Sequence, residues 1–216
     1  MTVDTWEMVL VHRVFRREFR ILPAIIRAVP PGDKARAEVV GEHLGEVSHG
    51  LHHHHEAEDE LLWPIMLDRV GLHADVVHRM EAQHLRLAEL LGRLDALNSQ
   101  WRASARQETR DGLADVVAQV SPVLEEHLGD EERDLLPLVS EFVTQAEWDA
   151  LGERGKEILP RNDLRKALVF LGASLEEASP AEARRFLATL PLPARVLWAL
   201  FGKRTYATAR DRVRQG

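Results

Sequence analysis

Residues 52–64 read HHHHEAEDELLWP, and the fold of the chain can be worked out from this stretch. His54 and Glu58 are four residues apart, and Pro64 follows the glutamate by six residues. The same three residue types recur 73 positions further on, in EEHLGDEERDLLP: His127, Glu131 and Pro137. A single histidine precedes each pair by 42 or 43 residues, and these two lie 72 positions apart: His12 and His84. Because all four positions recur at an offset of 72 or 73 residues, the sequence indicates a duplicated pair of helices.

The rest of the sequence is typical of long amphipathic helices. Stretches rich in Ala, Leu, Glu and Arg carry apolar residues three and four positions apart, and strand patterns are nearly absent. Proline and glycine breakers divide the first two-thirds of the chain into four helices, at about 4–28, 33 to between 64 and 71, 74–100, and 106 to between 137 and 143. Short connections between them predict an all-α, up-down-up-down four-helix bundle over residues 1–142. Residues 143–216 are expected to add three or four accessory C-terminal helices, since Thr144 and Ser179 begin capping sequences.

Each expected helix has one apolar stripe, and the only polar residues in these stripes are histidine and glutamate. The four stripes are Met8, His12, Phe15, Phe19, Leu22 and Ile26; Val40, Leu44, Val47, Leu51, His54, Glu58, Leu61 and Ile65; Val77, Met80, His84, Leu87, Leu91 and Leu94; and Leu113, Val117, Val120, Leu124, His127, Glu131, Leu135 and Leu138. Burying one polar group without a partner costs roughly 1–3 kcal/mol, against a total stability of about 5–15 kcal/mol. The six polar groups therefore need compensation.

A metal centre supplies that compensation. A lone histidine in an apolar stripe is more often a hydrogen-bonded core residue, and His-x-x-x-Glu is common as a surface pair, but four stripes and a repeat together outweigh these interpretations. The chain has no cysteine, which excludes thiolate sites and leaves imidazole and carboxylate ligands. Four imidazoles and two carboxylates suit two divalent or trivalent cations, and i, i+4 spacing places each His beside its Glu. The predicted ligands are His12, His54, Glu58, His84, His127 and Glu131.

The other histidines are expected to lie off the stripes. At 100° per residue, only His54 of the four consecutive histidines falls on the stripe of its helix. The pairs His52–Glu56 and His55–Asp59 have the same spacing, but neither keeps the proline offset of the second copy. We therefore expect the remaining histidines to be solvated or to orient neighbouring groups: His43, His49, His52, His53, His55, His73 and His78.

The charge is uneven and bears on the partners. The net charge is −7, and residues 193–216 carry +5, which leaves −12 on the first 192 residues. This acidic body argues against nucleic acid as a partner. The basic tail has an apolar run around Trp198 and Phe201; a membrane contact is one interpretation, but a helix docked on the bundle or forming a homodimer is favoured. The sequence has neither a secretory signal nor an apolar run of about 18–20 residues, so a cytoplasmic location is expected.

At this point the sequence resembles the hemerythrin-like HHE cation-binding domains. The family's motifs are matched by His12, by HHEAEDELLWP, by His84 in EAQHLRLAEL and by EHLGDEERDLLP, within residues 1–142. The resemblance implies a non-haem di-iron site in which Glu58 and Glu131 bridge two irons together with an oxo or hydroxo group. One iron would take His12 and His54, and the other His84 and His127.

One departure from the family affects the expected chemistry. Oxygen-carrying hemerythrins use His-x-x-x-His on the third helix, which gives five histidine ligands, whereas Met80 and Ala88 stand four residues from His84 here. Unless another side chain contributes, both irons have open positions. That favours a di-iron oxidoreductase acting on hydrogen peroxide or nitric oxide over oxygen (O2) storage. The alternatives are a non-catalytic binder or sensor of oxygen, nitric oxide or iron, and a structural zinc or manganese site.

Overall fold

The computed structural model describes residues 2–158 and 163–215, and within these ranges all regular structure is helical. The chain forms two compact units, one of Met1–Thr5 with Phe15–Ile158 and one of Trp6–Val14 with Leu159–Gly216. None of the described helices has the length and apolar character needed to cross a bilayer. The predicted all-α fold, a four-helix bundle with C-terminal helices, is confirmed. The predicted domain boundary after residue 142 stays a prediction.

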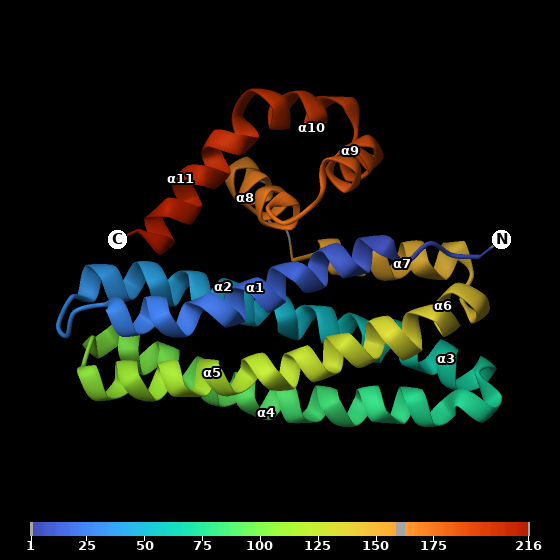
Figure 1. Ribbon diagram of the computed structural model, residues 1–216, viewed down its shortest axis with the longest axis horizontal. Helices are drawn as coiled ribbons and strands as arrows, with labels where there is room; N and C mark the ends of the chain where they lie inside the picture. Colours follow the sequence, from blue (N-terminus) through green and yellow to red (C-terminus); the bar gives the residue numbers. More distant parts are fainter. Residues whose placement is uncertain (1, 159–162, 216) are drawn as a thin grey trace. The chain divides into compact units, whose positions relative to one another are not determined.

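The first unit is the bundle. Its long helices are α1 (Trp6–Ala28), whose last part belongs to this unit, α2 (Lys34–Ala57), α4 (Ala74–Ser104) and α5 (Gln107–Asp130) (Figure 1). Helix α2 packs against α4, and α4 packs against α5. Ion pairs join α1 to α2 through Glu18 and His43, and α1 to α5 through Arg16 and Glu125. The long helices therefore enclose one interior, lined by the predicted stripes.

Local sequence determines where these helices begin and end. The Asp33 side chain accepts a hydrogen bond from the Arg36 backbone N–H, which caps the start of α2. Ala105, at φ 51°, ends α4 in the left-handed conformation. Gly71, at φ 52°, begins the 3₁₀ turn η2 (Gly71–His73) that leads into α4. Short connections of this kind produce the expected antiparallel order of neighbouring helices.

A π-helical turn follows both α2 and α5. The first, η1 (Glu58–Leu62), continues into α3 (Trp63–Arg69), and the second, η3 (Glu131–Leu135), continues into α6 (Leu136–Phe142). The two segments are offset by 73 residues, like the sequence repeat, and each begins at a predicted ligand. Each π turn holds one residue more than an α-helical turn.

These π turns correct part of the predicted stripes. A regular α-helix would have buried Leu61, Ile65 and Leu138, but these side chains are only half-buried. The interior positions after the turns are instead Leu62, Met66 and Val139, which are at most 2% exposed. The extra residue in each π turn explains why the apolar stripe moves by one position. By contrast, the regular helix α4 buries every predicted residue of its stripe.

The C-terminal segments contain the expected capping motifs. Helix α7 (Gln145–Lys156) begins with a capping box made by Thr144 and Glu147, and it packs on α2 and η1 in the first unit. The second unit contains α8 (Leu164–Leu175), α9 (Pro180–Thr189), and α10 (Leu192–Leu197), which continues through the π turn η4 (Trp198–Gly202) into α11 (Lys203–Arg214). Ser179 and Glu182 form a second capping box at the start of α9.

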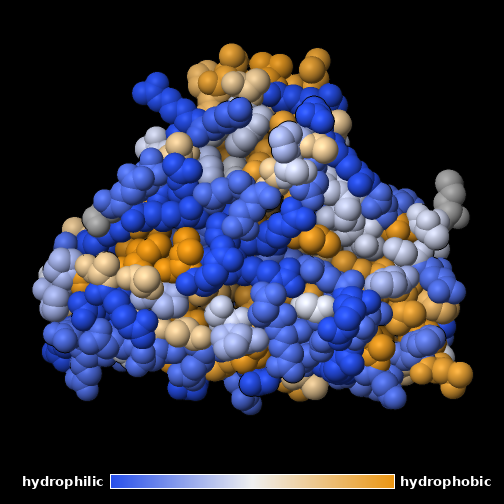
Figure 2. All heavy atoms as spheres, viewed as in Figure 1, coloured by the Kyte–Doolittle hydropathy of each residue, from blue (hydrophilic) through white to orange (hydrophobic). Residues whose placement is uncertain are grey.

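Within the second unit, side chains from the first turns of α1 contact α9. The Trp6 ring meets Phe186 edge-on with centroids 6.2 Å apart, and Arg13 pairs with Glu182 at 2.9 Å. Large apolar side chains of α10 and η4 remain exposed: Leu192, Val196, Leu200 and Phe201. Figure 2 shows hydrophobic (orange) atoms gathered at the upper edge of the view, where Figure 1 draws α10.

Candidate metal centre

Five of the six predicted ligands are buried, and His54 is largely buried. The side chain of His54 is 12% exposed, and the other five residues are at most 4% exposed. Their donor atoms fall into two groups, and within each group they lie within 4.8 Å of one another. We refer to His12, His54, Glu58 and Glu131 as the first group. The second group is His55, His84 and His127.

Glu58 links the two groups. One carboxylate oxygen, Oε1, lies 3.6 Å from Nε2 of His54 in the first group. The other oxygen, Oε2, lies 3.5 Å from Nε2 of His84 in the second group. Glu131 makes a similar approach, with Oε2 at 3.8 Å from Nε2 of His127. A carboxylate whose two oxygens face different histidines is arranged to bridge two cations.

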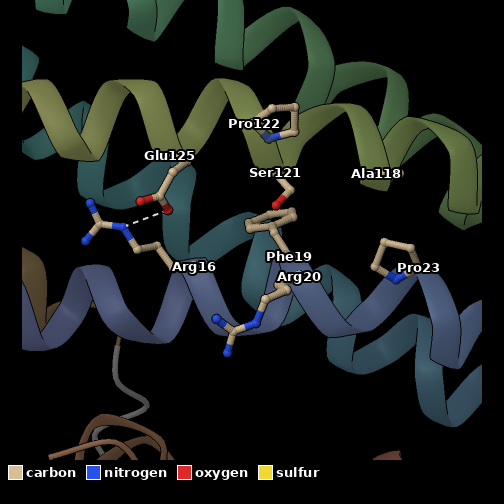
Figure 3. A pocket seen from close by; sticks show the side chains of 8 residues that line it. All are labelled: Arg16, Phe19, Arg20, Pro23, Ala118, Ser121, Pro122 and Glu125. Carbon is tan, nitrogen blue, oxygen red and sulfur yellow. Dashed lines mark hydrogen bonds and ion pairs between the residues drawn. The ribbon is translucent and has the colours of Figure 1, made fainter.

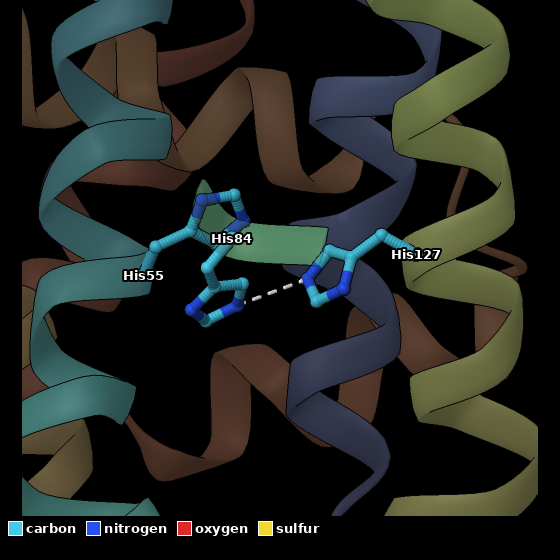
Figure 4. A group of neighbouring side chains, drawn as sticks. All are labelled: His55, His84 and His127. Atoms are coloured by element: carbon cyan, nitrogen blue, oxygen red, sulfur yellow. Dashed lines mark hydrogen bonds between the residues drawn. The ribbon is translucent and has the colours of Figure 1, made fainter. Parts of the chain in front are cut away.

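His55 was expected to lie off the stripe, and that expectation is wrong. Its side chain is 6% exposed, and its ring stacks on that of His84 with centroids 4.1 Å apart and an interplanar angle of 22°. It also meets the ring of His127 edge-on at 5.0 Å (Figure 4). The interior face of α2 is wide enough for two consecutive residues, His54 and His55. The repeat contained the signal, because the position equivalent to His55 is Leu128, an apolar residue that is fully buried.

Two polar side chains orient the histidines of the second group. Nδ1 of His84 lies 2.7 Å from a carboxylate oxygen of Asp59, so this nitrogen carries the proton and donates a hydrogen bond to the carboxylate. Nδ1 of His127 lies 3.2 Å from the amide oxygen of Gln83. The amide NH₂ of Gln83 in turn donates to Asp130 at 3.0 Å, which fixes the amide so that its oxygen faces His127. Sequence reasoning found neither Asp59 nor Gln83 as a contributor.

This orientation leaves the Nε2 atoms of His84 and His127 directed at each other. They are 3.2 Å apart and are joined by the dashed line in Figure 4. With both Nδ1 atoms protonated, two neutral imidazoles would present only lone pairs across this distance, which is repulsive. A cation bound to both nitrogens removes the repulsion, so the donor arrangement fits a metal ion.

The electrostatics of Glu58 lead to the same conclusion. Burial, together with the neighbouring charges of Glu131 and Asp59, raises the pKa of the Glu58 carboxyl well above its ordinary value. Among the described residues, neither Glu58 oxygen accepts a hydrogen bond. Two carboxylates in a dry interior require positive charge nearby to remain ionised. The interior offers imidazole and carboxylate donors for metal cations of this kind.

Other residues considered at the sequence level lie outside both groups. His52 is half-buried and lies 3.6 Å from Asp95, and Nε2 of His53 lies 2.8 Å from the backbone oxygen of Arg154. His78 is exposed and lies beside Glu81. Tyr206, the only tyrosine in the chain, donates a hydrogen bond to Glu176 within the second unit.

A surface pocket of about 630 Å³ lies between α1 and α5 (Figure 3). Its lining residues are Arg16, Phe19, Arg20, Pro23, Ala118, Ser121, Pro122 and Glu125. Arg16 and Glu125 pair at 3.0 Å at one end of it. None of these residues belongs to either donor group, so the pocket is not the metal site.

Comparison with known proteins identifies the family. A family model described as hemerythrin HHE cation binding domain matches residues 3–139. The matched range contains all seven residues of the two donor groups, as well as Asp59 and Gln83. No curated protein and no solved structure matches the chain significantly.

Proposed function

We propose that the chain is a non-haem di-iron protein that reacts with hydrogen peroxide or nitric oxide. The premise is that the chain belongs to the hemerythrin HHE cation-binding domain family. The observation that carries the proposal is the position of Glu58 between two groups of imidazole nitrogens. When bound, a pair of iron ions supplies redox-active cations that exchange electrons with such small molecules.

The donor set supports iron over softer metals. Imidazole and carboxylate are the side chains that non-haem iron uses in proteins, and the chain has no cysteine. In the proposed arrangement, one ion is held by His12 and His54 and the other by His55, His84 and His127. Glu58 and Glu131 would serve both ions. The cations and the two carboxylates would stabilise each other, because the carboxylates need the cations in order to remain charged inside the bundle.

The two groups supply different numbers of histidines, and this changes the reasoning about open positions. With His55 included, the second ion has three histidine donors. The expectation that both ions have open coordination positions therefore no longer holds. The ion of His12 and His54 has only two, so we place the binding of the small molecule there. The surrounding interior is apolar, with Phe15 at 5.6 Å from the His54 ring, and it keeps bulk water away.

A second candidate function is reversible binding of oxygen or nitric oxide without turnover. The observation that favours it is His55, because the chain then offers five histidines, the number found in the oxygen-carrying relatives described above. The fifth histidine comes from α2 next to His54, and not from a His-x-x-x-His pair on α4. The two candidates differ in one measurable respect, which is catalytic turnover.

The experiment is metal analysis followed by reaction with each small molecule. We expect two irons per chain, and an optical spectrum that changes on addition of hydrogen peroxide and then recovers. Disproportionation would release one O2 for every two peroxides consumed, which an oxygen electrode measures. Anaerobic titration with nitric oxide gives the corresponding test for that gas.

Each outcome has a distinct meaning. Oxygen release over many turnovers supports a catalase-like enzyme, and consumption of nitric oxide supports an enzyme acting on that gas. A stoichiometric spectral change that reverses when the gas is removed supports the binding function. Zinc or manganese in place of iron, or one metal per chain, contradicts the di-iron proposal.

A further inference from the structure

We propose that Asp59 is a positioning residue that fixes His84 as a metal donor and strengthens metal binding by the second group. The inference rests on the proposed metal site, but not on peroxide or nitric oxide as the substrate. It concerns a carboxylate that follows Glu58 directly in the sequence and lies in the π turn η1. Consecutive acidic residues thus face the two nitrogens of one imidazole.

The geometry around His84 is specific. Oε2 of Glu58 lies 3.5 Å from Nε2, and Oδ1 of Asp59 lies 2.7 Å from Nδ1. Because Asp59 accepts a hydrogen bond from Nδ1–H, the Nε2 lone pair is directed into the site. A carboxylate partner also increases the electron density on the imidazole more than a neutral partner would, and this strengthens metal binding.

Trp63 holds Asp59 in place. The indole Nε1–H donates to the same Oδ1 atom of Asp59 at 2.6 Å, and the Trp63 side chain is almost fully buried. The Asp59 side chain is half exposed, so its position would be poorly defined without this contact. A rigid ring from the start of α3 therefore anchors the carboxylate, which in turn orients His84.

The internal repeat provides a comparison inside the same molecule. The residue equivalent to Asp59 is Glu132, and it pairs with Arg16 at 2.5 Å. His127, the other histidine that the second copy contributes to this group, is oriented by the neutral amide of Gln83. The described structure thus places a carboxylate behind His84 and an amide behind His127. The control for Asp59 is Glu60, the next carboxylate of η1, which is exposed and lies 3.2 Å from Arg154.

The test measures metal affinity with Co²⁺, whose visible absorption reports the number and type of its ligands. Wild-type protein, Asp59→Leu, Asp59→Asn and Glu60→Gln are titrated with Co²⁺ in competition with a chelator. We expect the Leu variant to bind one of two Co²⁺ equivalents about 10- to 100-fold more weakly, which is the usual effect of removing such a partner. The Asn variant keeps a polar acceptor and should lose less, and Glu60→Gln should match wild type.

A further variant, Trp63→Phe, removes the indole N–H and should give a loss between those of the Asn and Leu variants. Thermal unfolding of the metal-free proteins shows whether each variant is folded. Equal Co²⁺ affinity in wild type and Asp59→Leu would overturn the proposal, as would an equal loss in Glu60→Gln or a wild-type protein that binds no Co²⁺. If the Asp59 variants lose affinity while the iron protein is inert toward peroxide and nitric oxide, the inference stands and the proposed function fails.

Discussion

Glu58 is the residue on which the candidate site depends most, because its two oxygens reach histidines of different groups. It is fully buried, and its carboxylate is stable as an anion only beside positive charge. His55 has a similar importance for the second group, where it stacks on His84. Single substitutions at these two positions should therefore have effects on metal binding that can be separated from effects on folding.

The first prediction concerns His55→Leu. Because Leu128 occupies the equivalent position of the repeat and is fully buried, leucine should be accommodated at position 55 without loss of the fold. We expect iron to fall from two toward one per chain, measured by elemental analysis after dialysis against a chelator. His52→Gln, at a half-buried position beside Asp95, is the control and should keep two irons. Full iron content in the leucine variant would exclude His55 as a ligand.

The second prediction concerns Glu58→Gln, which keeps the size of the side chain and removes its charge. The metal-free variant should be more stable than the metal-free wild type at pH 8, because a buried charge without a cation is unfavourable. A gain of about 1 kcal/mol would raise Tm by roughly 2–4 °C in a chain of this size. The same variant should bind iron poorly, and the exposed control Glu56→Gln should change neither property. A lower Tm for metal-free Glu58→Gln would contradict the assignment.

At the scale of the elements, regular helices were predictable and the π turns were not. The 3.6-residue period located the stripe of α4, from Val77 to Leu94, without error. In α2 the same period failed after Glu58, because one extra residue in η1 moves burial from Ile65 to Met66. A residue count cannot reveal such a turn, since the sequence on either side remains compatible with an α-helix. The orienting contacts of Asp59 and Gln83 were missed because they join residues of separate elements.

The contact between α1 and α2 gives a third prediction, about pH. Burial alone would raise the pKa of Glu18, but the hydrogen bonds and charges of His43 and Arg17 outweigh it and lower this pKa to about 2. Because the pKa in the folded protein is below the ordinary value of 4.5, this carboxylate stabilises the fold at higher pH. The stabilisation is lost as the pH falls from about 4.5 toward 2. Its full size is about 3 kcal/mol.

Urea unfolding of metal-free wild type and Glu18→Gln between pH 7 and pH 3 measures this contribution. The variant should be less stable by about 3 kcal/mol at pH 7, and the difference should shrink as the pH approaches 3. Using metal-free protein removes the effect of acid on metal binding. A difference that stays constant over this range would show that the Glu18 carboxylate is not responsible.

On the scale of the whole molecule, the sequence located the bundle and its helix boundaries but not the two compact units. The first turns of α1 are assigned with the C-terminal helices, through contacts such as Trp6 with Phe186. No spacing rule links residues so far apart in the chain. In the second unit, Glu176 accepts hydrogen bonds from Tyr206 and Arg214, which connects α8 with α11. These contacts lie outside the repeat on which the sequence reasoning relied.

The fourth prediction concerns the homodimer expected through the C-terminal helices. Leu192, Val196 and Leu200 are spaced by four residues and 48–70% exposed, so they form an apolar stripe that a second copy could cover. Light scattering after gel filtration should give a dimer for wild type and a monomer for the double variant Leu192→Gln and Leu200→Gln. Leu85→Gln, at an exposed position of α4, is the control and should stay dimeric. A monomeric wild type would contradict the expected homodimer.

The paired π turns also bear on the ancestry of the chain. A π turn holds one residue more than an α-helical turn, and here the extra residue occurs at the same place in both copies, at 58–62 and 131–135. The economical history is that the insertion came first and the helix pair was duplicated afterwards. The two copies now differ at single positions, such as Asp59 in the first and Glu132 in the second.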